Sequence, residues 1–165
     1  GASLKLKPPE LMTHELIADD ARQSLRDHCA AKGREVQAKY GPHLGWAELQ
    51  QLLADRTLVR YPCTVAFDSV PLQADELAYP EPLGARPDAG FRICVHPRFE
   101  ADPDAVIALV LYQLVVVNYG EFATSDDAEA FGSAALGCVR EDYYQRLCAL
   151  ADRVDALAAS SGEPA

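Results

Sequence analysis

The run of apolar residues at 105–117 constrains the fold of this chain more than any other segment. Its many β-branched residues would suit a strand, but the run is longer than an ordinary strand. Asp102 is a suitable helix cap, and Pro103 suits the first helical turn. Gly120 supplies a stop signal. The pattern therefore predicts a helix over residues 104–119 that is buried on nearly all sides, since the apolar run is too short to span a bilayer.

The rest of the chain predicts two N-terminal helices, a small sheet and a C-terminal helix or pair of helices. Helices are expected at residues 11–40 and 46–55 and from Thr124 onward; strands are expected at residues 58–67, 76–79 and 91–96. Gly33 is a candidate break in the first helix, and Pro62 indicates an edge position for the first strand. We therefore expect an α+β fold in which a small sheet packs on the central buried helix. One globular domain would span residues 10–159, between disordered segments at residues 1–9 and 160–165.

The charge balance limits the classes of partner. The sequence has 15 Lys and Arg residues against 25 Asp and Glu residues, a formal net charge of −10. Such a field repels phosphate backbones and weakens attraction to anionic lipid, so neither nucleic acid nor a membrane is an expected partner. Five widely spaced cysteines without a C-x-x-C pair indicate reduced thiols, and hence a cytoplasmic protein.

The segment around the central helix resembles the core of small zincin metallopeptidases, the SprT-like and minigluzincin groups. Residues 93–99 read Ile-Cys-Val-His-Pro-Arg-Phe, and the apolar helix ends in Asn-Tyr-Gly-Glu-Phe at residues 118–122. In that family an edge strand leads into a helix with the motif His-Glu-x-x-His, and a later helix adds a further ligand. The resemblance covers residues 91–137 and implies a zincin-like fold. The same helix is also consistent with the core of an unrelated α+β fold.

The residues that carry zincin chemistry are replaced. The resemblance places Tyr112, Gln113 and Val116 at the first histidine, the glutamate and the second histidine. A zinc site needs imidazole, thiolate or carboxylate ligands, and an amide cannot act as a general base near neutral pH. The carboxylates where a third ligand would arise are Asp126, Asp127 and Glu129. No metal or other cofactor is therefore expected.

The resemblance then implies a pseudo-metallopeptidase that binds a protein or peptide without cleaving it. Its degenerate cleft would be formed by Tyr112, Gln113, Val116 and Glu121. In peptidases of this type the edge strand pairs with extended substrate, and that ability would survive the loss of the metal. Here the strand at residues 91–96 would take that part.

Three other functions remain open from the sequence. Cys94 and His96 share one face of their strand and could form a nucleophile–base pair of a small hydrolase. The acidic cluster from Glu121 to Glu129 could furnish paired carboxylates for the same class of reaction. Finally, a seam of apolar residues follows heptad spacing and would either join two chains in a homodimer or pack on its own core. That seam consists of Tyr143, Leu147, Leu150, Val154 and Leu157.

Overall fold

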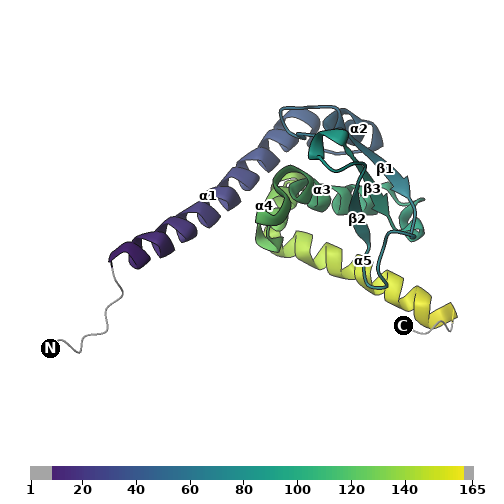
Figure 1. The fold of residues 1–165 in the computed structure, drawn as a ribbon. Coiled ribbons are helices and arrows are strands. Elements are labelled where there is room, and N and C mark those ends of the chain that lie inside the picture. The colour runs from purple at the N-terminus through teal and green to yellow at the C-terminus, as the bar shows by residue number, and fades with distance from the viewer. Residues whose placement is uncertain (1–8, 162–165) are drawn as a thin grey trace.

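The computed structural model describes the backbone of residues 9–161 and the side chains of residues 18–156. It has the expected α+β architecture, with a small mixed sheet on a central buried helix between N- and C-terminal helices (Figure 1). The helices are α1 (Pro9–Tyr40), α2 (Trp46–Leu53), α3 (Pro103–Tyr119), α4 (Ser125–Leu136) and α5 (Arg140–Ser161). The strands are β1 (Cys63–Phe67), β2 (Ala78–Pro82) and β3 (Phe91–Val95). Short 3-10 turns lie at Pro87–Ala89, Pro97–Phe99 and Gly120–Phe122.

The predictions for the two ends of the chain are not tested. The segments 1–9 and 160–165, expected to be disordered, lie outside the described residues, except that α1 begins at Pro9 and α5 ends at Ser161. The domain boundaries at residues 10 and 159 therefore stay predictions.

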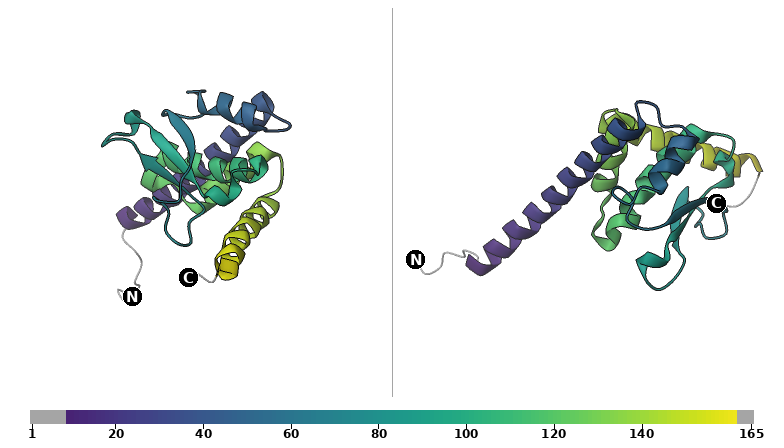
Figure 2. Two further views of the ribbon diagram at one scale, coloured as in Figure 1. Left: turned by 90° about the vertical axis from the view of Figure 1, so that its right-hand side faces the viewer. Right: turned by 90° about the horizontal axis from the view of Figure 1, so that it is seen from above.

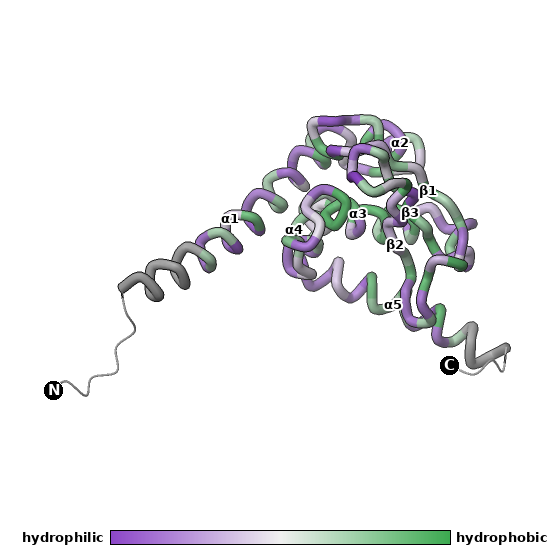
Figure 3. Tube along the Cα trace, viewed as in Figure 1, coloured by the Kyte–Doolittle hydropathy of each residue, from purple (hydrophilic) through white to green (hydrophobic). Residues whose placement is uncertain are grey.

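The central helix α3 forms where the sequence predicts it. The Asp102 side chain caps its N-terminus by accepting a hydrogen bond from the Ala105 N–H at 3.3 Å. At the other end the chain turns at Gly120, whose φ of +57° favours glycine. Most side chains between these ends are buried, and Figure 3 shows hydrophobic residues following one another along α3. The caps and the burial thus agree with the expected core helix.

The expectation that this segment is too short to span a bilayer is wrong, because the helical stretch Pro103–Phe122 in the described part of the chain is long and apolar enough to cross one by length and composition alone. Most of it is buried inside the fold, against the sheet and the neighbouring helices. The core helix of a globular domain meets the same criteria, so the packing accounts for its apolar character.

The sheet has the order β1-β3-β2, with β1 parallel and β2 antiparallel to β3. The strand that leads toward α3 is therefore central, and the expected edge position of residues 91–96 is wrong. Its backbone is paired with β1 on one side and with β2 on the other. The first strand does lie at an edge and begins directly after Pro62, as that proline indicates. The third strand is Ala78–Pro82, shifted from the expected residues 76–79.

The layers build outward from the sheet. One face of the sheet packs on α3, and α4 packs on α3 and is itself crossed by α1, while α5 contacts both α3 and α4. Figures 1 and 2 show the N-terminal half of α1 projecting away from this body as a rod. Residues 18–24 are accordingly exposed, and burial begins in the second half of the helix with Cys29 and Val36.

Two glycines set the close approach of the helices. Gly33 does not break α1, contrary to the expectation, because it lies where α1 crosses α4. A Cβ atom there would lie 2.4 Å from the Phe131 carbonyl oxygen. Gly132 makes room for Tyr143 in the same way, since its Cβ would lie 2.3 Å from the tyrosine ring. Both positions therefore need glycine for packing rather than for a turn.

Asp55 joins the end of α1 to the segment after α2. Its carboxylate accepts hydrogen bonds from Lys39 Nζ at 2.6 Å, Tyr40 Oη at 2.7 Å and Thr57 Oγ1 at 2.6 Å. The hydrogen bond from Lys39, followed by those from Thr57 and Tyr40, holds the pKa of Asp55 far below its usual range.

This depressed pKa predicts a pH-dependent contribution to stability. A carboxyl group with a lowered folded-state pKa stabilises the fold fully above its unfolded pKa of about 3.9, and this is lost as the pH falls through the folded pKa. We therefore expect Asp55→Asn to lower the free energy of unfolding most at neutral pH, with the difference from wild type shrinking in acid. Urea denaturation across that range measures it, with Asp20→Asn on the exposed part of α1 as control. A difference that stays constant with pH would contradict this role.

Candidate functional site

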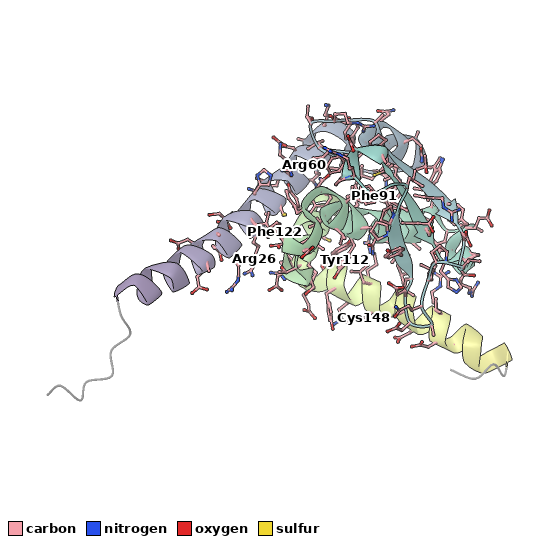
Figure 4. All side chains as sticks on the ribbon, viewed as in Figure 1. Arg26, Arg60, Phe91, Tyr112, Phe122 and Cys148 are labelled. Carbon is pink, nitrogen blue, oxygen red and sulfur yellow. The ribbon has the colours of Figure 1, made fainter. Side chains whose placement is uncertain are left out.

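An open groove of about 1160 Å³ lies between α3 and β2. Its lining comes from the C-terminal half of α3, from β2, from Phe91 at the start of β3, from the residues just before β1 and from the turn Gly120–Phe122. Figure 4 shows Arg60, Phe91 and Phe122 projecting from these separate elements. The lining includes eight aromatic or proline residues: Tyr61, Tyr79, Pro80, Pro82, Pro87, Phe91, Tyr119 and Phe122. Phe122 is 83% exposed, which is unusual for a phenylalanine.

Three of the four residues predicted for the degenerate cleft line this groove: Gln113, Val116 and Glu121. The fourth, Tyr112, lines a neighbouring hollow of about 460 Å³ between α3 and α5. Gln113 and Ala78 border both hollows, so the two form one continuous surface along β2. Tyr112, Gln113 and Val116 are half-buried on the side of α3 that is not fully covered. The structure thus brings the predicted residues to one surface instead of leaving them in solid core.

Two carboxylates of α4, those of Asp126 and Glu129, are paired with arginines. Glu129 lines the same hollow as Tyr112, and its carboxylate accepts a hydrogen bond from Arg140 at 3.2 Å. Asp126 pairs with Arg140 at 2.9 Å and with Arg26 at 3.2 Å. Each guanidinium stabilises the charged form of the carboxylate that it contacts. In the zincin-like arrangement implied by the resemblance, a metal cation would do this instead. In the part of the chain whose side chains are described, no three His, Cys, Asp or Glu residues are grouped to hold a metal ion.

The other acidic residues have separate tasks. Asp127 is buried and completes a capping box with Thr124, each side chain accepting a hydrogen bond from the other residue's backbone N–H. Glu121 is exposed at the groove. Within the residues from Glu121 to Glu129, Asp126 and Glu129 do come together, because both carboxylates pair with the same nitrogen of Arg140. The guanidinium therefore occupies the space between the two carboxylates that the sequence proposes as a catalytic pair. Burial, with Glu129 and Asp126 nearby, raises the pKa of the Tyr112 phenol, which keeps it protonated near neutral pH.

The side chains of Cys94 and His96 each make a hydrogen bond to a nearby backbone group. Cys94 is fully buried, and its thiol donates to the Arg92 carbonyl at 3.6 Å. Burial raises the pKa of the Cys94 thiol, so little reactive thiolate is present. The His96 Nδ1 atom accepts a hydrogen bond from the Arg98 N–H at 3.0 Å, and burial lowers the pKa of His96. Neither hydrogen bond joins the thiol to the imidazole, so the nucleophile–base pair stays a prediction.

The C-terminal seam faces the interior of its own domain. Tyr143, Leu150 and Val154 are buried and Leu147 is half-buried, while the side chain of Leu157 lies outside the described residues. The Tyr143 hydroxyl donates to the Ala108 carbonyl at 2.7 Å. The described part of the seam thus packs on α3 and α4, and little of it is left to join a second chain.

Sequence reasoning missed the clamp at the end of the groove. The Asn118 side chain accepts a hydrogen bond from the Arg60 N–H and donates one to the Leu58 carbonyl, both at 2.9 Å. The Arg60 guanidinium donates to the Asn118 carbonyl at 3.1 Å and lies 4.7 Å from the centre of the Tyr119 ring. This clamp fixes Arg60 and the adjacent Tyr61 at the groove. The available signal in the sequence is Asn118 itself, a polar side chain directly after the apolar run, which needs hydrogen-bond partners if it is buried.

Comparison with protein-family models, with curated proteins and with solved structures gave no match. The resemblance to small zincins therefore stays a prediction. The function is inferred below from the residues and the geometry of the site.

Proposed function

We propose that this chain is a non-catalytic, zincin-like domain that binds a protein or peptide segment in the groove between α3 and β2. The observation that carries the proposal is the position of the groove, which passes directly over Gln113 and Val116. These are the positions where the zincin resemblance would require the general base and the second histidine. The groove therefore coincides with positions that lack the residues for zinc chemistry, which supports binding without catalysis.

The wall of the groove determines how a ligand can bind. The Leu77 carbonyl accepts a hydrogen bond from the His96 N–H, and the Leu83 N–H donates to the Gly90 carbonyl. In an antiparallel pair this pattern alternates, so the odd-numbered residues of β2 pair with β3. Pro80 and Pro82 then direct their nitrogens to the free edge, where they can donate no hydrogen bond. The expected pairing of an extended ligand with the edge strand is therefore disfavoured here.

Side chains must then supply the recognition. Aromatic and proline-lined grooves suit apolar segments in the polyproline II conformation, which use few backbone hydrogen bonds to the receptor. Arg60, Glu76 and Glu121 border the groove and provide charged contacts at its margin. We therefore expect a ligand segment rich in proline and apolar residues.

Selection from a displayed library of random peptides tests this proposal. We expect enriched peptides whose binding weakens at least about 10-fold, or about 1.4 kcal/mol, in Val116→Arg and in Phe122→Ala. Leu83→Ala serves as control because Leu83 is also exposed but lies outside the groove lining. Peptides that bind the two groove variants as tightly as wild type would place the binding surface elsewhere.

A metal measurement tests the non-catalytic part of the proposal. Protein purified without added metal is expected to contain far less than one zinc ion per chain by elemental analysis. One zinc per chain, removable by a chelator together with peptidase activity, would overturn the assignment as a pseudo-metallopeptidase.

A further inference from the structure

The free edge of β1 is open for strand pairing. The Pro62 carbonyl accepts a hydrogen bond from the Phe91 N–H at 2.8 Å, and the Asp68 N–H donates to the Val95 carbonyl at 3.2 Å. In a parallel pair the bonded residues of one strand alternate, so the even-numbered residues of β1 pair with β3. The backbone groups of Cys63, Val65 and Phe67 therefore point outward. Their N–H groups have no hydrogen-bond partner in the part of the chain that the structure describes.

The two edges of this sheet are treated differently. β2 carries two prolines that remove donors from its free edge, whereas β1 has the uncharged sequence Cys-Thr-Val-Ala-Phe. Prolines, lysines and inward-pointing charges are the usual protections of an edge strand, and β1 has none of them. Figures 1 and 2 place β1 on the side of the body away from the projecting half of α1, so that part of α1 does not cover the edge.

We propose that a second copy of this chain pairs with β1 in an antiparallel arrangement, joining the two sheets into one. The outward-pointing residues are symmetric about Val65, as a two-fold axis requires. An axis there sets Val65 against the partner's Val65 and Cys63 against the partner's Phe67. Each opposed pair exchanges both of its N–H···O=C bonds, so all the open donors and acceptors of the edge are used at once.

The charges at the ends of the strand favour a second copy in this direction. The Arg60 guanidinium before β1 makes no ion pair with the described residues, whereas Asp68 after β1 shares Arg92 with Glu81 and leaves an excess negative charge at that end. Antiparallel pairing therefore brings opposite charges to the same end, whereas parallel pairing would bring like charges together. Val70, which is 88% exposed, lies just beyond the strand. The chain turns there, with the Val70 N–H bonded to the Asp68 side chain at 2.9 Å, so Val70 adds an exposed apolar side chain close to the end of the paired edge.

Light scattering at increasing protein concentration tests the pairing directly. The mass is expected to rise from 17.9 kDa toward twice that value. Val65→Pro removes the central outward donor and is expected to keep the chain monomeric at the same concentrations. The bonds of β1 to β3 do not use the Val65 N–H, and β2 already carries prolines at its outward positions. The groove variant Phe122→Ala is expected to dimerise like wild type, which separates this edge from the peptide site.

Disulfide trapping fixes the register, and it remains informative if Val65→Pro does not fold. Opposed Cα atoms in a hydrogen-bonded antiparallel pair lie about 5.5 Å apart, within disulfide range. Under mild oxidation Phe67→Cys is expected to form a covalent dimer through the partner's Cys63, identified by mass spectrometry of the linked peptide. The double variant Cys63→Ser with Phe67→Cys is the matched control and should not form this dimer. A single-chain mass at all concentrations, or a dimer without this linkage, would overturn the proposal.

Discussion

Replacing Tyr143 with alanine is expected to lower the free energy of unfolding by about 3–5 kcal/mol, the range for large-to-small changes of a buried aromatic residue. The ring is fully buried where α5 meets α3 and α4. It fills the space left by Gly132, so its removal would leave a cavity that neighbouring side chains cannot fill without moving the backbone. The Ala108 carbonyl would also lose the hydrogen bond that it accepts from the Tyr143 hydroxyl. Urea denaturation of both proteins measures the difference.

Two matched variants separate packing from hydrogen bonding at this position. Tyr143→Phe keeps the ring and removes only the hydroxyl, so a loss of about 1 kcal/mol is expected. Tyr144→Ala changes the next residue, which is 46% exposed, and is expected to cost no more than about 0.5 kcal/mol. If the alanine variants at the two positions were equally stable, the packing of α5 on the core described above would be wrong.

The parts of the fold that sequence predicts well are those whose signals are local. The cap at Asp102, the first-turn Pro103 and the stop at Gly120 lie within the segment that they delimit, so α3 was found with nearly its observed bounds. Gly137, whose φ of +70° suits glycine, ends α4 and so decides between the single C-terminal helix and the pair of helices that the sequence left open. Both signals act through the backbone of a few consecutive residues.

The errors concern relations between distant segments. Alternation along residues 91–96 indicates a strand but does not say which strands lie on either side, so the central position of β3 could not be read from it. A glycine within a helical pattern looks the same in the sequence whether it breaks the helix or lets another helix approach, and Gly33 is such a residue. Only the position of Phe131, far along the chain, distinguishes the two.

In the candidate site, too, the residues that share one helix could be predicted from the sequence, whereas the contacts between separate elements could not. Tyr112, Gln113 and Val116 share a helix, so their common surface follows from helical spacing. The aromatic lining of the groove comes from separate loops and strands, and no local pattern announces it. The pairing of Glu129 with Arg140 is likewise tertiary and joins α4 to the start of α5. The sequence thus indicated the position of the site on α3, and the structure adds its shape and charge partners.

The clamp at Asn118 predicts the second large effect, because one side chain supports both the fold and the groove. Asn118→Ala would leave the Arg60 N–H and the Leu58 carbonyl without their partners at a partly buried position. Leaving two such groups unpaired is expected to lower the free energy of unfolding by about 2–4 kcal/mol in urea denaturation. The Arg60 guanidinium would keep its hydrogen bond to the backbone carbonyl of residue 118, but the backbone between Arg60 and Tyr61 would lose its anchor on α3, so peptide binding in the groove should weaken.

Gln113→Ala is the matched control for this prediction. Gln113 is also an amide on α3 and lines the groove, but its side chain makes no hydrogen bond to the described residues. Its removal is therefore expected to change stability by no more than about 0.5 kcal/mol while still altering peptide binding. A loss of stability at Asn118 no greater than that at Gln113 would mean that the segment between α2 and β1 is held by other contacts. Loss of binding in both variants, with loss of stability in only one, is the expected signature of a groove whose wall depends on the core helix beneath it.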